Sequence, residues 1–227
     1  MRSLHFRASA LLLALSASTA SAQNIESPYR FVDPAQQVNV FAGGIESDAG
    51  TLGLGPESDM AFGARYGIRL SGPFSVEGAV TIFPTNRGIQ DTIISGADTS
   101  LVSTGAEAGM TIGIVTADLR FDITGPRTWH RLMPFALLGI GGAFAITEDD
   151  AADEALDPNL RYDFGTRLVG ELGLGVEWFP ADHLTLRLDA RNMLWKIEAP
   201  PGLQNLDAPT EEWVQNFLLS AGVSFRF

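Results

Sequence analysis

Residues 213–227 read WVQNFLLSAGVSFRF, and the pattern of this stretch decides the fold. In steps of two residues, one face carries Phe217, Leu219, Ala221, Val223, Phe225 and Phe227. The other face carries Asn216, Leu218, Ser220, Gly222, Ser224 and Arg226. A two-residue period predicts a β-strand whose two faces meet different surroundings. Because the apolar face runs to the last residue, it suits the outside of a closed barrel in lipid, where every backbone group is paired.

Seven earlier segments repeat the same alternation. With the last stretch they cover residues 37–46, 58–71, 74–85, 110–124, 132–147, 166–179, 184–197 and 213–227. Each reaches the roughly 9–11 residues that a tilted strand needs to cross the hydrocarbon layer. The breaks between segments alternate strictly between long and short, which is typical of barrels with short periplasmic turns and longer outer loops. We therefore predict an all-β fold, an eight-stranded antiparallel up-and-down transmembrane β-barrel.

The N-terminus has the features of a secretory signal. Arg2 and Arg7 supply the positively charged start, residues 8–17 form an apolar run, and the small residues 20–22 form a cleavage site. That run is too short for the competing interpretation, a transmembrane anchor. We predict a cleaved signal peptide over residues 1–22, a short periplasmic leader over residues 23–36 and the barrel domain over residues 37–227.

Composition excludes several classes of function. The chain has 15 Lys and Arg against 27 Asp and Glu, a net charge of −12, and nucleic acid binding needs the opposite sign. It contains no Cys, and its histidines His5, His130 and His183 fall in the signal and in two short turns. Neither a zinc site nor a nucleophilic triad can be built from these residues. We predict no cofactor, no metal site, no nucleic acid partner and no enzymatic activity.

Two long loops leave alternatives open. The acidic run over residues 148–157 could capture a divalent cation, but it lacks the spacing of a calcium loop, which favours a solvated loop. The loop over residues 86–109 is almost free of charge. It could extend its two strands as a hairpin above the membrane, which we favour, or it could contact a partner.

The predicted inward face carries charges of both signs in equal number. Its seven arginines and seven carboxylates are Asp59, Arg65, Arg69, Glu77, Asp118, Arg120, Asp122, Arg167, Glu171, Glu177, Arg187, Asp189, Arg191 and Arg226. An eight-stranded barrel is just wide enough to be filled by its own side chains, and buried charges need partners. We therefore predict a paired charge network that largely plugs a polar lumen.

The predicted outward face raises two further points. Aromatic residues collect at both ends of the segments, which predicts two interfacial rings that include Phe83, Phe135 and Trp195. Four polar residues also fall on this face toward the long-loop ends, namely Glu46, Asn192, Lys196 and Gln215. Either these ends stand above the hydrocarbon layer, or the segment over residues 184–197 contains a bulge.

Taken together, the signal, the eight amphipathic segments and the terminal aromatic residue resemble the small outer-membrane β-barrel family of OmpA and OmpX type, often labelled porin-like. Val223, Phe225 and Phe227 match the terminal signal that this family presents to the outer-membrane assembly machinery. The resemblance implies a bacterial outer-membrane location, contact with outer-membrane lipids and lipopolysaccharide, and a monomer. It implies a structural, adhesive or surface-interaction role, or alternatively a narrow channel for small or apolar solutes.

Overall fold

A computed structural model describes residues 27–32, 36–95, 98–148, 151, 156–204 and 210–227, with backbone only for residues 91–95, 98–103 and 148. The strands are β1 (Tyr29–Phe31), β2 (Gln36–Ser47), β3 (Asp59–Ser71), β4 (Phe74–Ser95), β5 (Asp98–Asp122), β6 (Arg127–Trp129), β7 (Leu132–Glu148), β8 (Thr166–Trp178), β9 (Leu184–Glu198) and β10 (Glu211–Arg226), with one 3₁₀ helix, η1 (Pro201–Leu203). None of the helical structure in these described ranges is long and apolar enough to cross a membrane. The predicted signal peptide lies outside the described residues.

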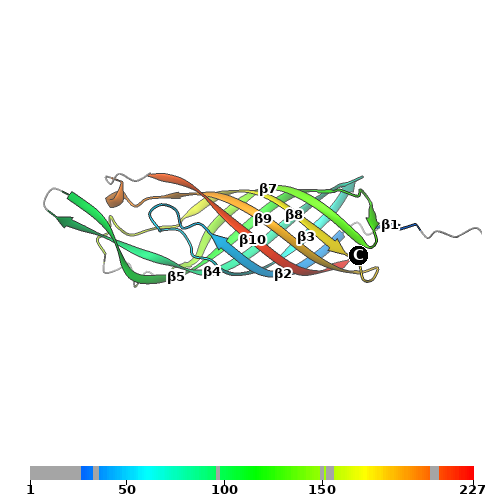
Figure 1. The fold of residues 1–227 in the computed structure, drawn as a ribbon, viewed down its shortest axis with the longest axis horizontal. Coiled ribbons are helices and arrows are strands. Elements are labelled where there is room, and N and C mark those ends of the chain that lie inside the picture. The colour runs from blue at the N-terminus through cyan, green and yellow to red at the C-terminus, as the bar shows by residue number, and fades with distance from the viewer. Residues whose placement is uncertain (1–26, 33–35, 96–97, 149–150, 152–155, 205–209) are drawn as a thin grey trace, which may run out of the picture.

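Eight of the strands form one closed antiparallel barrel (Figure 1). Strand β2 pairs with β3, β3 with β4 and β4 with β5; β5 then pairs with β7, β7 with β8, β8 with β9 and β9 with β10. The barrel closes where β10 pairs with β2, from Asn216 opposite Ser47 to Arg226 opposite Gln37. This topology confirms the predicted fold class and the role of the last stretch as the closing strand.

The stagger between neighbouring strands sets their tilt from the barrel axis. Direct cross-strand partners lead from Leu132 once around the wall through Trp178, Leu186, Val223, Val40, Ala64, Val80 and Val115 to Gly142. The circuit therefore returns to β7 ten residues further on, at position 142 instead of 132. With ordinary strand spacings, this stagger corresponds to a tilt of about 40° from the barrel axis.

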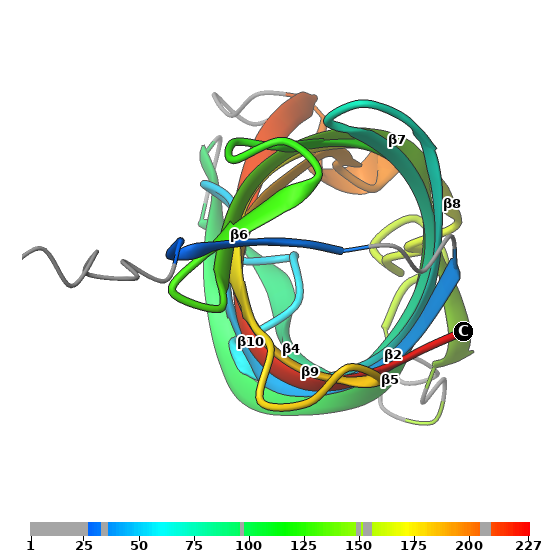
Figure 2. The same ribbon diagram turned by 90° about the vertical axis from the view of Figure 1, so that its right-hand side faces the viewer.

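The two ends of the barrel differ (Figure 1). At the long-loop end, β4 and β5 continue as one hairpin to Ser95 opposite Asp98, with a register irregularity between Gly88 and Gln90. This confirms the hairpin predicted for residues 86–109, which projects well beyond the rest of the wall. At the short-turn end, β1 crosses the mouth of the barrel and pairs with β6, Tyr29 opposite Trp129 (Figure 2). Part of the predicted leader is therefore a strap.

The outer wall is apolar, as in a protein surrounded by lipid. Its exposed side chains include Leu138, Leu174, Leu188 and Leu219 along the middle, and Phe74, Phe121, Trp178, Phe225 and Phe227 at the short-turn end. Three aromatics do not belong to the interfacial rings, and that prediction was wrong for them. Phe83, Phe135 and Trp195 are at most 1% exposed, because their positions in the two-residue alternation point inward.

Candidate functional site

The barrel interior is the site that the sequence singled out, and it divides into two layers. The layer toward the short-turn end is built from charged side chains, whereas the layer toward the long loops is apolar. The charged layer itself consists of two groups of ion pairs. We call them the central cluster and the lower cluster, the latter lying nearer the short-turn end.

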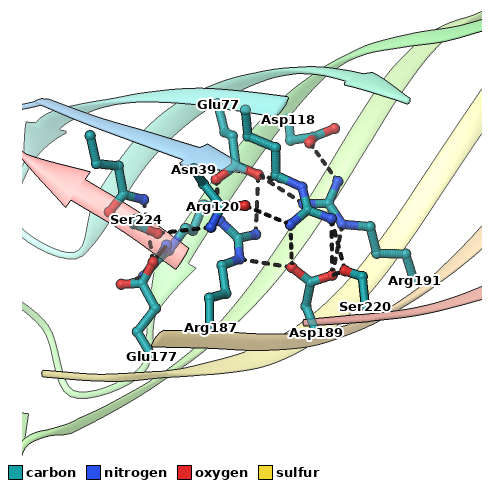
Figure 3. A network of polar contacts seen from close by, with 12 residues as sticks. Asn39, Glu77, Asp118, Arg120, Glu177, Arg187, Asp189, Arg191, Ser220 and Ser224 are labelled. Carbon is teal, nitrogen blue, oxygen red and sulfur yellow. Dashed lines mark hydrogen bonds and ion pairs between the residues drawn. The ribbon is translucent and has the colours of Figure 1, made fainter. Parts of the chain in front are cut away.

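The central cluster joins three arginines to four carboxylates. Figure 3 shows its members Glu77, Asp118, Arg187, Asp189 and Arg191. Glu77 of β4 accepts hydrogen bonds from Arg191 at 2.8 Å and from Arg187 at 3.1 Å, both on β9. Asp189 forms ion pairs with Arg187 at 2.7 Å and with Arg65 of β3 at 3.1 Å. Arg191 also contacts Asp118 of β5 at 3.1 Å and pairs with Glu171 of β8. Strands from opposite walls are thereby tied across the lumen.

The lower cluster joins three arginines to two carboxylates. Arg120 of β5 donates two parallel bonds to Glu177 of β8, at 2.7 and 2.8 Å, and a third to Asp122 at 2.8 Å. Arg226 of β10 reaches Glu177 at 3.3 Å, and Arg69 of β3 reaches Asp122 at 3.2 Å. Two-point pairing of a guanidinium with a carboxylate is the strong form of this contact.

Twelve of the fourteen predicted lumen residues meet in these clusters, six arginines and six carboxylates. Two do not. Arg167 pairs instead with Glu198 near the long-loop end, at 2.8 Å. Asp59 is exposed, and its carboxylate accepts a bond from the amide of Met60. Its place in the alternation points inward, but it stands at the open end of β3, beyond the packed interior.

Neutral polar residues complete the charged layer, and the sequence reasoning missed them. Asn39 of β2 accepts a bond from Arg65 at 3.1 Å and donates one to Ser224 at 2.9 Å. Ser220 accepts a bond from Arg65 at 3.0 Å and donates one to Asp189 at 2.7 Å. Their inward places in the alternation were the available signal. They carry no charge, so a network predicted from charged residues alone does not contain them.

Aromatic rings and glycines shape the room that the arginines occupy. Phe135 lies under two guanidinium groups, those of Arg120 at 4.0 Å and Arg187 at 4.5 Å. On β7, the strand of Phe135, inward-facing glycines leave space for the large charged side chains. A Cβ added at Gly139 would lie 1.9 Å from a carboxylate oxygen of Asp118. Close packing, rather than nucleotide binding, therefore accounts for the inward-facing glycines of β7, Gly139 and Gly141, as the sequence indicated.

The apolar layer fills the half of the lumen nearest the long loops, so the polar lumen predicted from the sequence is found only in the half nearest the short turns. Its strand residues include Phe41, Ile45, Phe83, Met110, Ile112, Ile114, Met193, Trp195, Val214 and Leu218. Loop residues Leu54, Tyr162, Phe164 and Leu203 pack onto them. The rings of Phe164 and Trp195 meet edge to face, 6.4 Å apart.

The long loops are connected to one another above the apolar layer. The first loop meets the β4–β5 hairpin where the Glu57 amide donates to the Asn86 carbonyl at 2.8 Å. It meets the start of β10, directly after the last loop, where Thr51 donates two bonds to Glu212, at 2.8 and 2.9 Å. The last two loops meet where the Gly202 amide donates to the Asn159 carbonyl at 2.8 Å. The loops thus form a connected lid.

Little room is left within the charged layer. A pocket of about 20 Å³ opens among Gln37, Glu77, Arg120 and Arg226, enough for a water molecule. Among the described residues, no group of His, Asp or Glu is placed to hold a metal ion. Most of the acidic run over residues 148–157 lies outside the described residues.

A closed antiparallel barrel with an apolar outer wall and a packed charged interior defines a transmembrane β-barrel protein. The family model of the outer membrane protein beta-barrel domain matches residues 8–227, and the chain belongs to this family. In barrels of this class the short turns face the periplasm and the long loops face outward. We therefore call the two ends periplasmic and extracellular from here on.

Solved structures with the same architecture include the outer membrane protein OprG of Pseudomonas aeruginosa. It matches at a TM-score of 0.50 with 16% identity, over 86% of this chain and 96% of that one. Neisserial surface protein A matches at a TM-score of 0.49 with 15% identity, over 85% of this chain and 97% of that one. At such low identity the likeness concerns the fold alone. A comparison with curated protein sequences gives no match.

Proposed function

We propose that this chain resides in the bacterial outer membrane as a monomer and acts through its extracellular surface, in a structural or adhesive role, without conducting ions. The observation that carries the proposal is the two-layer filling of the lumen. An ion passing through would have to separate the paired clusters and then cross a packed apolar layer. Both steps are costly, because each removes charges from their partners or from water.

The extracellular surface is the part left free to meet other molecules. Its exposed charges are mostly acidic and include Glu57, Asp59, Glu107, Asp157, Asp163, Glu198 and Glu211. Such a surface favours partners that present positive charge, and attraction to them would weaken as salt increases. The linked loops hold this surface in one arrangement, which lowers the entropy lost on binding. We propose no enzymatic activity, since the interior charges pair with one another rather than facing a substrate cavity.

The assembly machinery of the outer membrane is the remaining proposed partner. Phe225 and Phe227 are exposed on the outer wall at the periplasmic end, with stacked rings whose centroids lie 6.4 Å apart. Val223 follows on the same face. An exposed apolar row at the end of the closing strand supports the proposal that these three residues are read during insertion.

Planar-bilayer recording tests the proposal against a narrow channel. We expect the purified wild-type barrel to give no reproducible single-channel steps. The double variant Trp195→Ala with Phe164→Ala serves as a comparison, because it removes two rings from the apolar layer and should conduct more often. Stable steps from the wild-type protein at a uniform conductance would contradict the proposal and favour the channel.

A further inference from the structure

A pocket opens at the periplasmic mouth of the barrel, beside the strap that β1 forms across it (Figure 2). Its volume is about 490 Å³, which lies in the range of pockets that bind small molecules. Three parts of the chain surround it: residues 30–32 and 128 of the paired strands β1 and β6, residues 179–183 between β8 and β9, and the terminal Phe227. Arg131, in the turn between β6 and β7, completes the lining.

The pocket lies against the inner face of the strap. Arg30 is paired with Thr128, which is only 2% exposed, and Val32 on the same face is also buried. Arg127 belongs to the outer face, where its guanidinium lies over the ring of Phe31 at 4.5 Å. Because the inner face is turned toward the barrel mouth and not toward the membrane, the pocket favours a water-soluble ligand over a lipid chain.

The charged groups of this pocket have no charged partner, unlike those of the charged layer. Arg30, Arg131 and Asp182 all line it, and none of them forms an ion pair with any residue in the described part of the chain. Arg131 donates one hydrogen bond, to the Pro180 carbonyl at 3.4 Å. All three charged residues are exposed at the mouth. Two positive groups and one negative group are therefore accessible to a ligand from the periplasm.

The backbone that carries Arg131 is strained. Trp129 and Leu132 pair across a two-residue turn in which φ is 49° at His130 and 64° at Arg131. These are the two non-glycine residues with positive φ in the described ranges. A type I′ turn requires positive φ at both central positions, and Asn followed by Gly adopts it most readily. Since strained residues of this kind collect at ligand-binding sites, the turn favours a binding role for the Arg131 side chain.

Apolar residues line the rest of the pocket, among them Val32, Phe179, Pro180 and Ala181. The ring of Phe179 is held in place by the guanidinium of Arg226, which lies 4.3 Å from its centre. The carbonyl oxygen of Phe227 is already bonded, since it accepts the Gln36 amide at 3.3 Å. A free inorganic anion would leave the apolar lining unused. A small peptide would use the apolar lining and the charged groups together.

We propose that this pocket binds a short periplasmic peptide with two carboxylates and an amine, the carboxylates bonded to Arg30 and Arg131 and the amine to Asp182. A guanidinium binds a carboxylate through charge-assisted hydrogen bonds, and an ammonium group donates to a carboxylate. The stem peptides of peptidoglycan have this chemistry and lie on this side of the outer membrane. The inference rests on the proposed outer-membrane location and adds a binding site to it. It does not depend on whether the lumen conducts.

Two soluble tripeptides that differ by one carboxylate test the proposal. They are L-Ala-γ-D-Glu-meso-diaminopimelate, which carries the additional carboxylate, and L-Ala-γ-D-Glu-L-Lys, which lacks it. Isothermal titration of the folded barrel in nonionic detergent micelles measures both affinities. We expect the diaminopimelate peptide to bind about tenfold more tightly, the factor that one charge-assisted hydrogen bond contributes. Equal affinities, binding of neither peptide, or displacement of the peptide by one equivalent of phosphatidylglycerol would overturn the proposal.

Variants at the mouth separate binding from folding. His130→Asn combined with Arg131→Gly relieves the turn, so the barrel should resist urea at least as well as the wild type. Its affinity for the diaminopimelate peptide should nevertheless fall about tenfold, and Arg30→Gln should have a similar effect. Arg127→Gln, on the outer face of the strap, is the matched control and should leave the affinity unchanged. Asp182→Asn should weaken both tripeptides alike, because both carry the amine.

Heat-modifiable migration on gels establishes that each variant is folded. Unchanged affinity in Arg30→Gln and in the turn variant would overturn the proposal. Lower stability of the turn variant with unchanged affinity would also overturn it, because Arg131 would then serve the fold and not a ligand.

Discussion

Neutralising Glu177 tests whether the charged layer stabilises the barrel. This buried carboxylate accepts both bonds from Arg120, one from Arg226 at 3.3 Å and one from Gln37 at 3.3 Å. Glu177→Gln keeps its shape and removes its charge. Arg120 then retains Asp122 at 2.8 Å, while Arg226 retains only the side-chain oxygen of Gln37 at 3.4 Å.

The expected cost follows from that remaining pairing. Removing one partner of a buried ion pair destabilises a protein by about 3–5 kcal/mol, because the other charge stays buried without compensation. Since Arg120 keeps one carboxylate, we expect the lower end, about 3 kcal/mol in the free energy of unfolding. Glu198→Gln is the matched control. Its carboxylate is half exposed and pairs with Arg167 at 2.8 Å, so its loss should cost less than about 1 kcal/mol.

Urea unfolding of the barrel in phospholipid vesicles, followed by tryptophan fluorescence, measures both values. The double variant Arg120→Gln with Glu177→Gln should recover part of the loss, because it removes the charge left without its main partner. If Glu177→Gln costs no more than Glu198→Gln, the charged layer does not stabilise the fold in the way argued, and the reasoning is refuted.

Three further predictions concern packing, the loops and assembly. Gly139→Ala should lower the free energy of unfolding by about 1–3 kcal/mol in the same assay, because the added Cβ has no room. Gly44→Ala on the open outer wall should lower it by less than about 1 kcal/mol. Equal losses for the two variants would contradict the close packing at Gly139. Glu212→Ala should remove both bonds from Thr51 and speed proteolysis of the first loop in intact cells, and an unchanged cleavage rate would argue against a connected lid. Deleting Phe227 should lower the amount inserted in the membrane more than it lowers stability, and normal insertion levels would exclude the assembly signal.

Much of the wall was predictable because its pattern is local. Alternation placed β3, β7, β8 and β9 within one residue of their observed bounds, since a side chain's inward or outward direction depends only on its place along the strand. The same rule identified twelve of the residues that meet in the charged layer. It failed for Asp59, because direction along a strand carries no information about where the packed interior ends.

The apolar layer was not predictable for a related reason. Over residues 112–115 the sequence has no polar residue on either face, with Ile112 and Ile114 facing inward and Val115 facing outward. Without contrast between faces, the alternation gives no sign of what fills the lumen. The contribution of Leu54, Phe164 and Leu203 depends on how the loops fold back, which no periodic pattern describes.

The sequence by itself determined the class of fold, the number of strands in the barrel wall, the apolar outer wall and the set of charges that face inward. Only the tertiary structure decided which charges pair and that the lumen has two layers. The physical reason is the stagger of the closed barrel. It brings Glu77 to Arg187 and Arg120 to Glu177 across the lumen, and it sets the height of every side chain along the axis.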